Sequence, residues 1–407
     1  MLFRSSGLEY GFVFTLDDLK PYSSGSVTNA SWVSGSRAAG TSFTALVSGS
    51  LDGAYDGVLK LGFDRFTAPL FGGFDGVDVT EKEPFNNRIL DDNSTELNSY
   101  VFNSISRAID SISDPELIEC SVLSVPGITH KGLTNQILSV AEKRRDLLAV
   151  IDIPGGYVPS SERATGATEE YLSSNKGDVT TTVNNLVDRQ INNSYAAAYY
   201  PWVQIVDQET GAVVWVPPSV PALGAISYTE RNADVWIAPA GFTRGGLSRG
   251  AAGIPVTAVK QKLSSTERDK LYEVNINPIA SFPAEGIVIL GQKTLQGYAS
   301  ATDRINVRRL LNYTKVEISK IASNLLFDPN LQITWNRFDA QASILLKSIQ
   351  TRFGLQEWKI VLDASTTTPD LVDRNTMYAK IFLKPARAIE FIGIDFVITN
   401  SGASFND

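Results

Sequence analysis

One uninterrupted apolar run constrains the fold of this chain more than any other segment. Residues 147–156 read LLAVIDIPGG, so the run ends in a proline and two glycines. A short apolar run bounded by turn residues is typical of a strand that is buried on both faces. Such strands occur in parallel sheets that carry helices on each side. We therefore expect this run to lie inside an α/β layer.

The neighbouring segments support the same layer. Residues 98–112 and 133–146 space their apolar side chains at helical intervals, and residues 118–127 form a short strand-like run that ends in Pro-Gly. The order helix, strand, helix, strand predicts parallel pairing. Residues 184–207 predict a further helix and strand. Prolines cluster in residues 211–226, where we expect an extended connection that leads into a helix near Ala222.

The two ends of the chain differ from this middle part. Residues 1 to about 80 are rich in Gly, Ser and Thr, and residues 42–66 predict short antiparallel strands between Asp-Gly pairs. Residues 302–326 predict a helix of about seven turns. Residues 339–354 predict a second helix, with Gly354 in the position that follows the helix. The apolar stripe of the first helix consists of Ile305, Leu310, Leu311, Ile318, Ile321 and Leu325.

Three strands are expected after these helices, at residues 358–363, 378–386 and 388–399. The last one alternates strictly and places large apolar side chains on one face. They are Ile392, Ile394, Phe396 and Ile398. Exposing this face to water is unfavourable, so the strand needs a sheet to pair with. A sheet of the same chain and a sheet of another copy both remain open at this point.

The composition excludes several function classes. The net charge is −8, which argues against general nucleic-acid binding, because that needs clustered Lys and Arg. The single cysteine, Cys120, allows no intrachain disulfide and fits a reducing compartment. The single histidine, His130, lies in a short polar loop, so histidine-based catalysis is not expected. The chain has no apolar run long enough to span a membrane, and its start has no signal-peptide pattern.

Residues 235–246, VWIAPAGFTRGG, are the strongest candidate for a ligand site. They suggest an apolar strand that runs into a glycine-rich turn. A phosphate-binding loop also needs a Lys followed by Ser or Thr, and both glycine-rich fingerprints are absent. We therefore interpret Gly241, Gly245 and Gly246 as glycines that permit positive φ in a turn. We expect Arg244 to contact a carboxylate of a partner.

Pairs of carboxylates give no stronger case for catalysis. Asp114 with Glu116, and Asp92 with Glu96, lie in polar segments beside turns and are interpreted as solvated charges. Residues 91–96 lack the spacing of a calcium loop and are expected to cap a helix. No catalytic residue, metal ligand or cofactor site is therefore expected, and the chain is not expected to be an enzyme.

The order of the segments resembles the contractile tail sheath family of myophages and related injection machines. The resemblance covers roughly residues 66–405 and depends on motifs in sequence rather than on any single one. They lie at residues 70–79 (LFGGFDGVDV), 217–241, 271–279 (LYEVNINPI), 286–295 (GIVILGQKTL), 305–318 (INVRRLLNYTKVEI), 360–399 and 401–405 (SGASF). The start, MLFRSSGLEYGF, does not resemble the extended N-terminal arm that family members use to join a neighbouring sheet.

The resemblance implies a multidomain α+β and α/β chain with four parts. We expect a β-rich, variable outer module at residues 1–80, which is incomplete, and an α/β sheath domain at 81–260. A C-terminal α/β sheath core follows at 261–387. Residues 388–407 form an arm strand that is donated to a neighbouring subunit, through Ile389, Phe391, Ile392, Ile394, Phe396 and Ile398.

The function implied by the resemblance is mechanical. Sheath subunits form six-fold rings that stack helically around the tail tube and contract to drive the tube through the host envelope. The implied partners are further copies, the tail tube protein, and baseplate and tail terminator proteins, without direct nucleic-acid or membrane contact. The implied location is the virion tail, assembled in the bacterial host cytoplasm. A sheath from a non-phage injector, such as a pyocin-like or secretion-like machine, fits equally.

Exposed charge pairs suit interfaces that must switch, because each is weak and easily exchanged. These candidate charge residues are expected to contact other subunits or the tube: Lys143, Arg144, Arg145, Arg244, Arg308, Arg309, Asp114, Glu116 and Glu119. A solvated face remains the alternative for Arg308 and Arg309. Two rival functions remain. Tight nucleotide binding would favour a metabolic enzyme, and closed shells in electron micrographs would favour a static shell protein.

Overall fold

The computed structural model describes part of the chain. The described residues are 19–24, 27–32, 85–87, 90, 94–96, 99–159, 162, 175–363 and 365–390. They fall into two compact units, one made of Met1–Pro84 with Asn93–Ile105 and the other of Phe85–Asp92 with Ser106–Asp407.

The first unit contains a β-hairpin. Strand β1 (Leu19–Ser24) pairs antiparallel with β2 (Val27–Trp32). The strands predicted at residues 42–66 lie outside the described residues. Helix α2 (Tyr100–Ser111) confirms the helix predicted at 98–112; its residues up to Ile105 belong to this unit and the rest to the second. The helix buries Val101, Ile105 and Ile109 on one face.

The second unit is built around a five-stranded sheet with the strand order β10-β9-β5-β4-β3. The predicted parallel pairing is confirmed, because β3, β4, β5 and β9 are parallel, and β10 is antiparallel to β9. Every residue of β4 is buried, as the apolar run predicts. The strands are β3 (Val122–Ser124), β4 (Leu148–Ile151), β5 (Ala196–Tyr200), β9 (Ile276–Phe282) and β10 (Gly286–Ile289).

A second, antiparallel sheet has the order β7-β6-β8. Its strands are β6 (Val203–Val206), β7 (Val213–Val216) and β8 (Val256–Val259). It shares a hydrophobic core with the larger sheet, where Val203 and Val256 pack with Leu148 and Ile279. The domain limit predicted at residue 260 lies just after β8, and the predicted limits stay a prediction.

Helices surround these sheets. Helix α3 (Lys131–Arg144) confirms the helix predicted at 133–146, and His130 caps its start by accepting a hydrogen bond from the Leu133 amide at 3.5 Å. The single histidine thus has a local structural role. The other helices of this layer are α5 (Val179–Asp188), α6 (Ser219–Asn232) and α8 (Ser265–Glu273).

The helix expected near Ala222 is confirmed as α6, although it begins at Ser219 and therefore includes Pro221, which is tolerated in the first turn because the amides there need no helical acceptor. The strand expected in the glycine-rich segment is wrong. Residues 235–240 form no strand, and the short helix α7 (Gly241–Arg244) follows them. Of the three glycines for which a positive φ was expected, Gly241 alone has one, of 85°. Gly245 and Gly246 have φ of −94° and −74°. Gly245 is needed for close approach, because a Cβ there would lie 2.8 Å from the Ile289 carbonyl oxygen.

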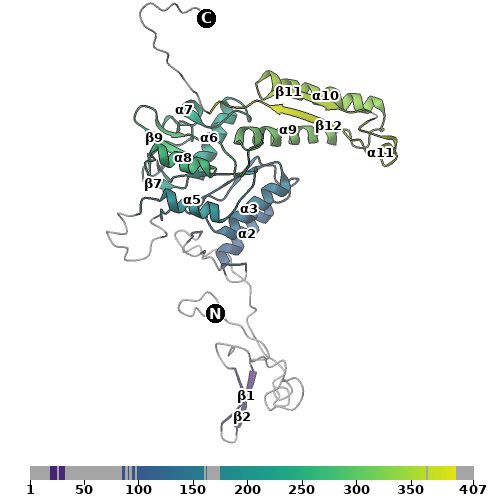
Figure 1. The fold of residues 1–407 in the computed structure, drawn as a ribbon. Coiled ribbons are helices and arrows are strands. Elements are labelled where there is room, and N and C mark those ends of the chain that lie inside the picture. The colour runs from purple at the N-terminus through teal and green to yellow at the C-terminus, as the bar shows by residue number, and fades with distance from the viewer. Residues whose placement is uncertain are drawn as a thin grey trace, which may run out of the picture. The chain divides into compact units, whose positions relative to one another are not determined.

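The C-terminal part of the second unit packs two long helices on a β-ribbon (Figure 1). Helix α9 (Ile305–Ser323) is shorter than predicted, and α10 (Gln332–Thr351) starts earlier than predicted. The predicted strands at 358–363 and 378–386 are confirmed as β11 (Leu355–Val361) and β12 (Lys380–Pro385), which are antiparallel, with α11 (Pro369–Asp373) between them.

One face of this ribbon is covered and the other is open. Trp358, Ile360, Ile381 and Leu383 pack with Leu310 of α9 and Leu346 of α10. The opposite face carries cross-strand pairs that are exposed. These pairs are Lys359 with Phe382 and Glu357 with Lys384.

The end of α10 differs from the expectation. Phe353, with φ of 63°, occupies the left-handed position after the helix, and Gly354 follows it. The Gly354 amide donates to the Ile349 carbonyl at 2.9 Å and the Phe353 amide donates to the Gln350 carbonyl at 3.1 Å, which is the Schellman pattern. Gly354 is required by packing instead, because a Cβ would lie 2.6 Å from Ile349 Cγ2 and 3.0 Å from the Trp236 ring.

Candidate functional site

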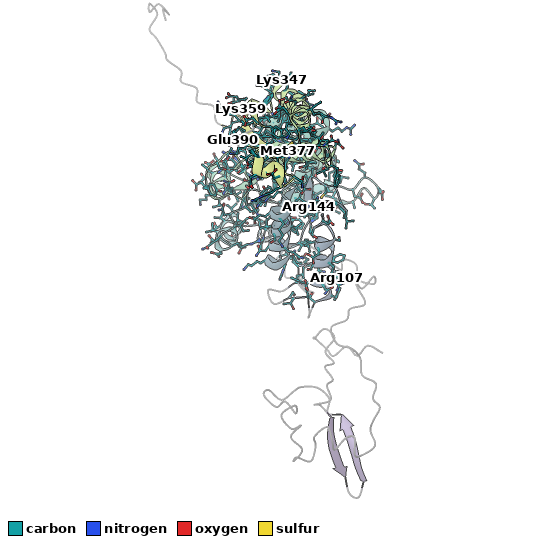
Figure 2. All side chains as sticks on the ribbon, turned by 90° about the vertical axis from the view of Figure 1, so that its right-hand side faces the viewer. Arg107, Arg144, Lys347, Lys359, Met377 and Glu390 are labelled. Carbon is teal, nitrogen blue, oxygen red and sulfur yellow. The ribbon has the colours of Figure 1, made fainter. Side chains whose placement is uncertain are left out.

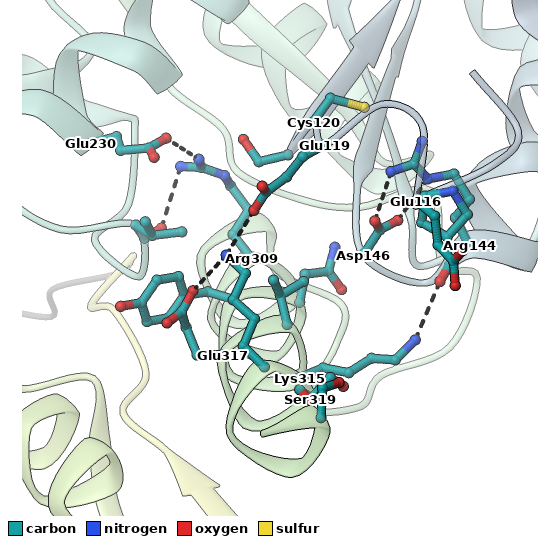
Figure 3. Close-up of a pocket in the computed structure, with 18 of the residues that line it drawn as sticks. Glu116, Glu119, Cys120, Arg144, Asp146, Glu230, Arg309, Lys315, Glu317 and Ser319 are labelled. Atoms are coloured by element: carbon teal, nitrogen blue, oxygen red, sulfur yellow. Dashed lines mark hydrogen bonds and ion pairs between the residues drawn. The ribbon is translucent and has the colours of Figure 1, made fainter. Parts of the chain in front are cut away.

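A cavity of about 900 Å³ brings several of the candidate charge residues together. It lies between the connection from α2 to β3 and the outer side of α9 (Figure 3). Glu116, Glu119, Arg144 and Arg309 line it, so residues far apart in the sequence meet at one place. The other charged residues of the lining are Asp146, Glu230, Lys315, Glu317 and Lys320. With them, the cavity has nearly equal numbers of positive and negative side chains.

Arg144 supports the protein's own backbone. Its guanidinium makes two hydrogen bonds to Asp146, at 2.9 and 2.8 Å, and donates to the carbonyls of Ile112 at 2.5 Å and Ile118 at 3.0 Å. The residue is 6% exposed, so it is not the surface charge that the sequence suggested. The hydrogen bonds to Asp146 raise the pKa of Arg144, which keeps the guanidinium charged.

Arg308 and Arg309 are also buried, which differs from both readings of the sequence. Arg309 donates to Glu230 at 2.6 Å and to the Val235 carbonyl at 3.4 Å, and thereby ties α9 to α6. Arg308 donates to the Ser194 carbonyl at 3.1 Å and to the Ser194 hydroxyl. Its guanidinium carbon lies 4.0 Å from the centre of the Tyr195 ring, and burial lowers its pKa. These partners all belong to the same chain.

The remaining candidate charge residues are exposed. Glu119 forms an ion pair with Lys320 at 2.7 Å, and Arg145 donates to the Glu142 carbonyl at 3.3 Å. Asp114 accepts a hydrogen bond from the Glu116 amide at 2.9 Å, and Arg244 donates to the Ala238 carbonyl at 3.1 Å. Lys143 lies on the exposed last turn of α3. Contacts of these residues with other subunits stay a prediction.

A site that the sequence did not suggest lies at Glu390, the last described residue. Arg304 binds both carboxylate oxygens, at 2.6 and 2.9 Å, and the Tyr272 hydroxyl donates to one of them at 2.7 Å. Burial by itself would raise the pKa of Glu390, but the hydrogen bonds from Arg304 and Tyr272 outweigh it and lower the pKa. No sequence signal marks this site, because its members come from separate elements.

The donor strand predicted at 388–399 is described only at its beginning. Residues 386–390 form no strand, and Ile389 is 82% exposed. Phe391, Ile392, Ile394, Phe396 and Ile398 lie outside the described residues. The strand therefore stays a prediction.

Within the described ranges, no group of three or more His, Cys, Asp or Glu side chains could hold a metal ion. No described helix is both long and apolar enough to cross a bilayer.

The chain is similar to curated proteins from phages. It is 30% identical over 305 residues to the tail sheath protein of Vibrio phage KVP40, which covers 73% of this chain and 44% of that protein. It is 29% identical over 279 residues to the tail sheath protein of Enterobacteria phage T4, which covers 69% of this chain and 41% of that protein. The chain thus spans less than half the length of these relatives. No family model matches it.

Solved structures share the fold. A chain of the anti-feeding prophage baseplate matches with a TM-score of 0.55 and 20% identity, over 73% of each chain. A chain of the PVC sheath complex, an extracellular contractile injection system in its contracted state, matches with a TM-score of 0.54 and 23% identity, over 72% of this chain and 76% of that one. The fold is therefore that of contractile sheath and baseplate subunits. The phage relatives are tail sheath proteins, and the chain is similar to them over about 70% of its length, as its motifs predict.

Proposed function

We propose that this chain is a structural subunit of a contractile phage tail sheath. Copies form hexameric rings that stack helically around the tail tube, and contraction of the array drives the tube through the host envelope. The similarity to the KVP40 tail sheath protein over 305 residues carries this proposal. The role is structural and involves no catalysis. The domain limits 1–80, 81–260, 261–387 and 388–407 belong to the same proposal.

The energy for contraction is stored during assembly, so no nucleotide takes part. An extended array can trap subunits in a state of higher free energy if neighbours remain tethered while they rotate. Main-chain hydrogen bonds between strands provide such a tether, because they survive rigid-body motion. Weak exposed charge pairs supply contacts that can be exchanged.

The ribbon β11–β12 is the proposed receptor for the tether. It contains two strands within the described residues, so each strand has one edge without a strand partner. A two-stranded ribbon is marginal by itself and gains stability from added strands. Residues 388–399 of a neighbouring copy supply such a strand, through Ile389, Phe391, Ile392, Ile394, Phe396 and Ile398.

The proposed partners are further copies, the tail tube protein, and baseplate and tail terminator proteins. The protein lies in the virion tail and is assembled in the host cytoplasm. A sheath of a non-phage injector is the second candidate, favoured by the fold match to the anti-feeding prophage and PVC machines. Genes for a capsid and a portal beside the gene for this chain would decide for the phage tail.

Electron microscopy of the concentrated protein tests the proposal. We expect helical tubes from the full chain, and no tubes from a variant that ends at Arg387, because it lacks the donor strand. Circular dichroism should show that the shortened variant still folds. A full chain that stays monomeric at every concentration would contradict the sheath function, and tubes from the shortened variant would contradict the strand donation alone.

A further inference from the structure

A groove of about 820 Å³ lies between α7, α8 and the residues that precede the C-terminal segment. Arg244, Arg268 and Arg387 line it, and Asp269 and Glu390 are the acidic residues beside them. Glu390 does not neutralise these cations, because both of its oxygens bind Arg304. The groove therefore carries excess positive charge on a chain whose net charge is −8.

These arginines lack carboxylate partners. Arg244 is exposed, and within the described residues it donates only to the Ala238 carbonyl, at 3.1 Å. Arg268 donates to the Leu263 carbonyl at 3.2 Å and stacks 5.3 Å from the centre of the Phe282 ring. Across the described part of the chain, none of the three arginines forms an ion pair with a carboxylate. A carboxylate that enters the groove therefore displaces no internal ion pair.

The groove is also partly apolar. Phe242 is 47% exposed and packs edge-on against Phe282, with ring centres 5.4 Å apart. Ile389 at the other side is 82% exposed. A partner that suits this groove combines carboxylates with apolar side chains.

The same chain presents such a segment elsewhere. Residues 113–119, between α2 and β3, are all exposed and include Asp114 and Glu116. Between these acids and β3 lie Leu117, which is 77% exposed, and Ile118, which is 39% exposed. Asp114 and Glu116 make no ion pair within the described residues, and the hydrogen bond between Asp114 and the Glu116 amide holds the segment in a turn.

The groove and the acidic segment are separate on the molecule. Arg144 donates a hydrogen bond to the Ile118 carbonyl and therefore lies beside the acidic segment. Glu390 lines the groove. Figure 2 shows these two residues well apart. The two surfaces also share no residue with each other, so a contact between them joins different copies.

We infer that the acidic segment 114–119 of one copy docks in the arginine-lined groove of the next copy. This inference rests on the proposed sheath function and names one of its interfaces. A contact between two different surfaces is heterologous, which is the kind that builds rings and helical stacks. Facing opposite charges lower the repulsion between acidic copies and fix their register.

A charge-swap experiment tests the inference. The variants of the full chain are Arg244→Glu, Glu116→Arg and the two combined. The control is Arg374→Glu, at the exposed residue that follows α11 and pairs with Asp370 at 3.3 Å. Sedimentation measures their association and electron microscopy records tubes. We expect each single swap to weaken association about tenfold or more, because it places like charges together. The combined variant should recover most of the wild-type association, and the control should match the wild type.

The outcomes separate the inference from the sheath function. Wild-type tubes that both single swaps leave unchanged would overturn the inference and leave the sheath function intact. Loss of association in Arg244→Glu without recovery in the combined variant would also overturn it, because the groove would then receive another partner, such as the tube. A wild-type chain that never associates would contradict the sheath function itself. Thermal unfolding verifies that each variant is folded.

Discussion

Buried charged side chains fix the connections of the second unit. Asp152 follows β4 and is 1% exposed. It accepts hydrogen bonds from the Gly127 amide at 2.8 Å, the Ser219 amide at 3.1 Å and the Ser219 hydroxyl at 2.6 Å. One carboxylate thus joins the turn after β3 to the start of α6. The sequence placed Asp152 in a buried strand but could not reveal its partners, which are distant along the chain.

Replacing Asp152 should therefore be costly. We expect Asp152→Ala to lower the free energy of unfolding by about 2 to 4 kcal/mol, because two buried donors and one half-buried donor lose their acceptor. Chemical denaturation measures the change, with the exposed Asp373→Ala as control. A loss as small as that of the control would show that water replaces the carboxylate.

Asp152 should also give the stability a pH dependence. Burial raises its pKa to about 6 from 3.8, despite the hydrogen bonds from Ser219 and Gly127. The folded protein then binds more protons than the unfolded chain between about pH 4 and 6, so this residue's contribution to stability falls as the pH rises through that range. The change is on the order of 3 kcal/mol. Asp152→Asn should lack it, and equal pH profiles for the two proteins would contradict the assignment.

Gly354 offers a test of close packing at a single position. We expect Gly354→Ala to destabilise the protein by about 1 to 3 kcal/mol, because the added methyl group overlaps Ile349 and the Trp236 ring. Gly297→Ala is the control, since the nearest atom there is 3.8 Å away. Equal melting temperatures for the two variants would show that the ring moves aside.

At the scale of elements, Trp236 joins α9, α10 and the ribbon to the rest of the unit. Its ring packs with Leu310, Leu346 and Ile349, and its indole N–H donates to the Arg352 carbonyl at 3.0 Å. This explains why residues 235–240 form no strand: their apolar side chains pack against distant helices instead of alternating in a sheet. Spacing alone cannot distinguish these two arrangements.

Removing this contact should destabilise the second unit as a whole. We expect Trp236→Ala to lower the free energy of unfolding by about 3 to 5 kcal/mol, as for other large-to-small core changes. Phe382→Ala, on the open face of the ribbon, should change it by less than about 0.5 kcal/mol. Denaturant titration followed by circular dichroism compares them, and similar losses would mean that the ribbon's open face is covered.

The elements themselves were largely predictable. The order of α2, β3, α3 and β4 and their parallel pairing follow from the apolar spacing. The length and burial of α9 could not be predicted from this spacing. Its first turns are buried on all sides, and Arg308 and Arg309 lie there among polar partners. A stripe-based pattern assigns such arginines to the outside of a helix. The antiparallel sheet β7-β6-β8 was also not foreseen, since its strands are short and separated by α6.

For the whole molecule, the balance between strand links and charge contacts can be measured. Exposed charges are screened within about 3 Å at 1 M salt. We expect sedimentation to show large assemblies at low salt and smaller, still associated, species at 1 M salt, because hydrogen-bonded strands resist screening. Complete dissociation into monomers at 1 M salt would mean that charges alone hold the array, and no change would mean that they contribute little.

The open face of the ribbon has a consequence for the chain before it meets its neighbours. Strands with unpaired edges are templates for amyloid-like growth, and lysines beside them are a common protection. Lys359 and Lys384 lie on this face, opposite Phe382 and Glu357, and Lys384 forms an ion pair with Glu357 at 3.9 Å. Lys359 forms no ion pair within the described residues, so its charge is the one that disfavours contact between two such faces. This lysine would then help to keep the free protein in solution without precipitating.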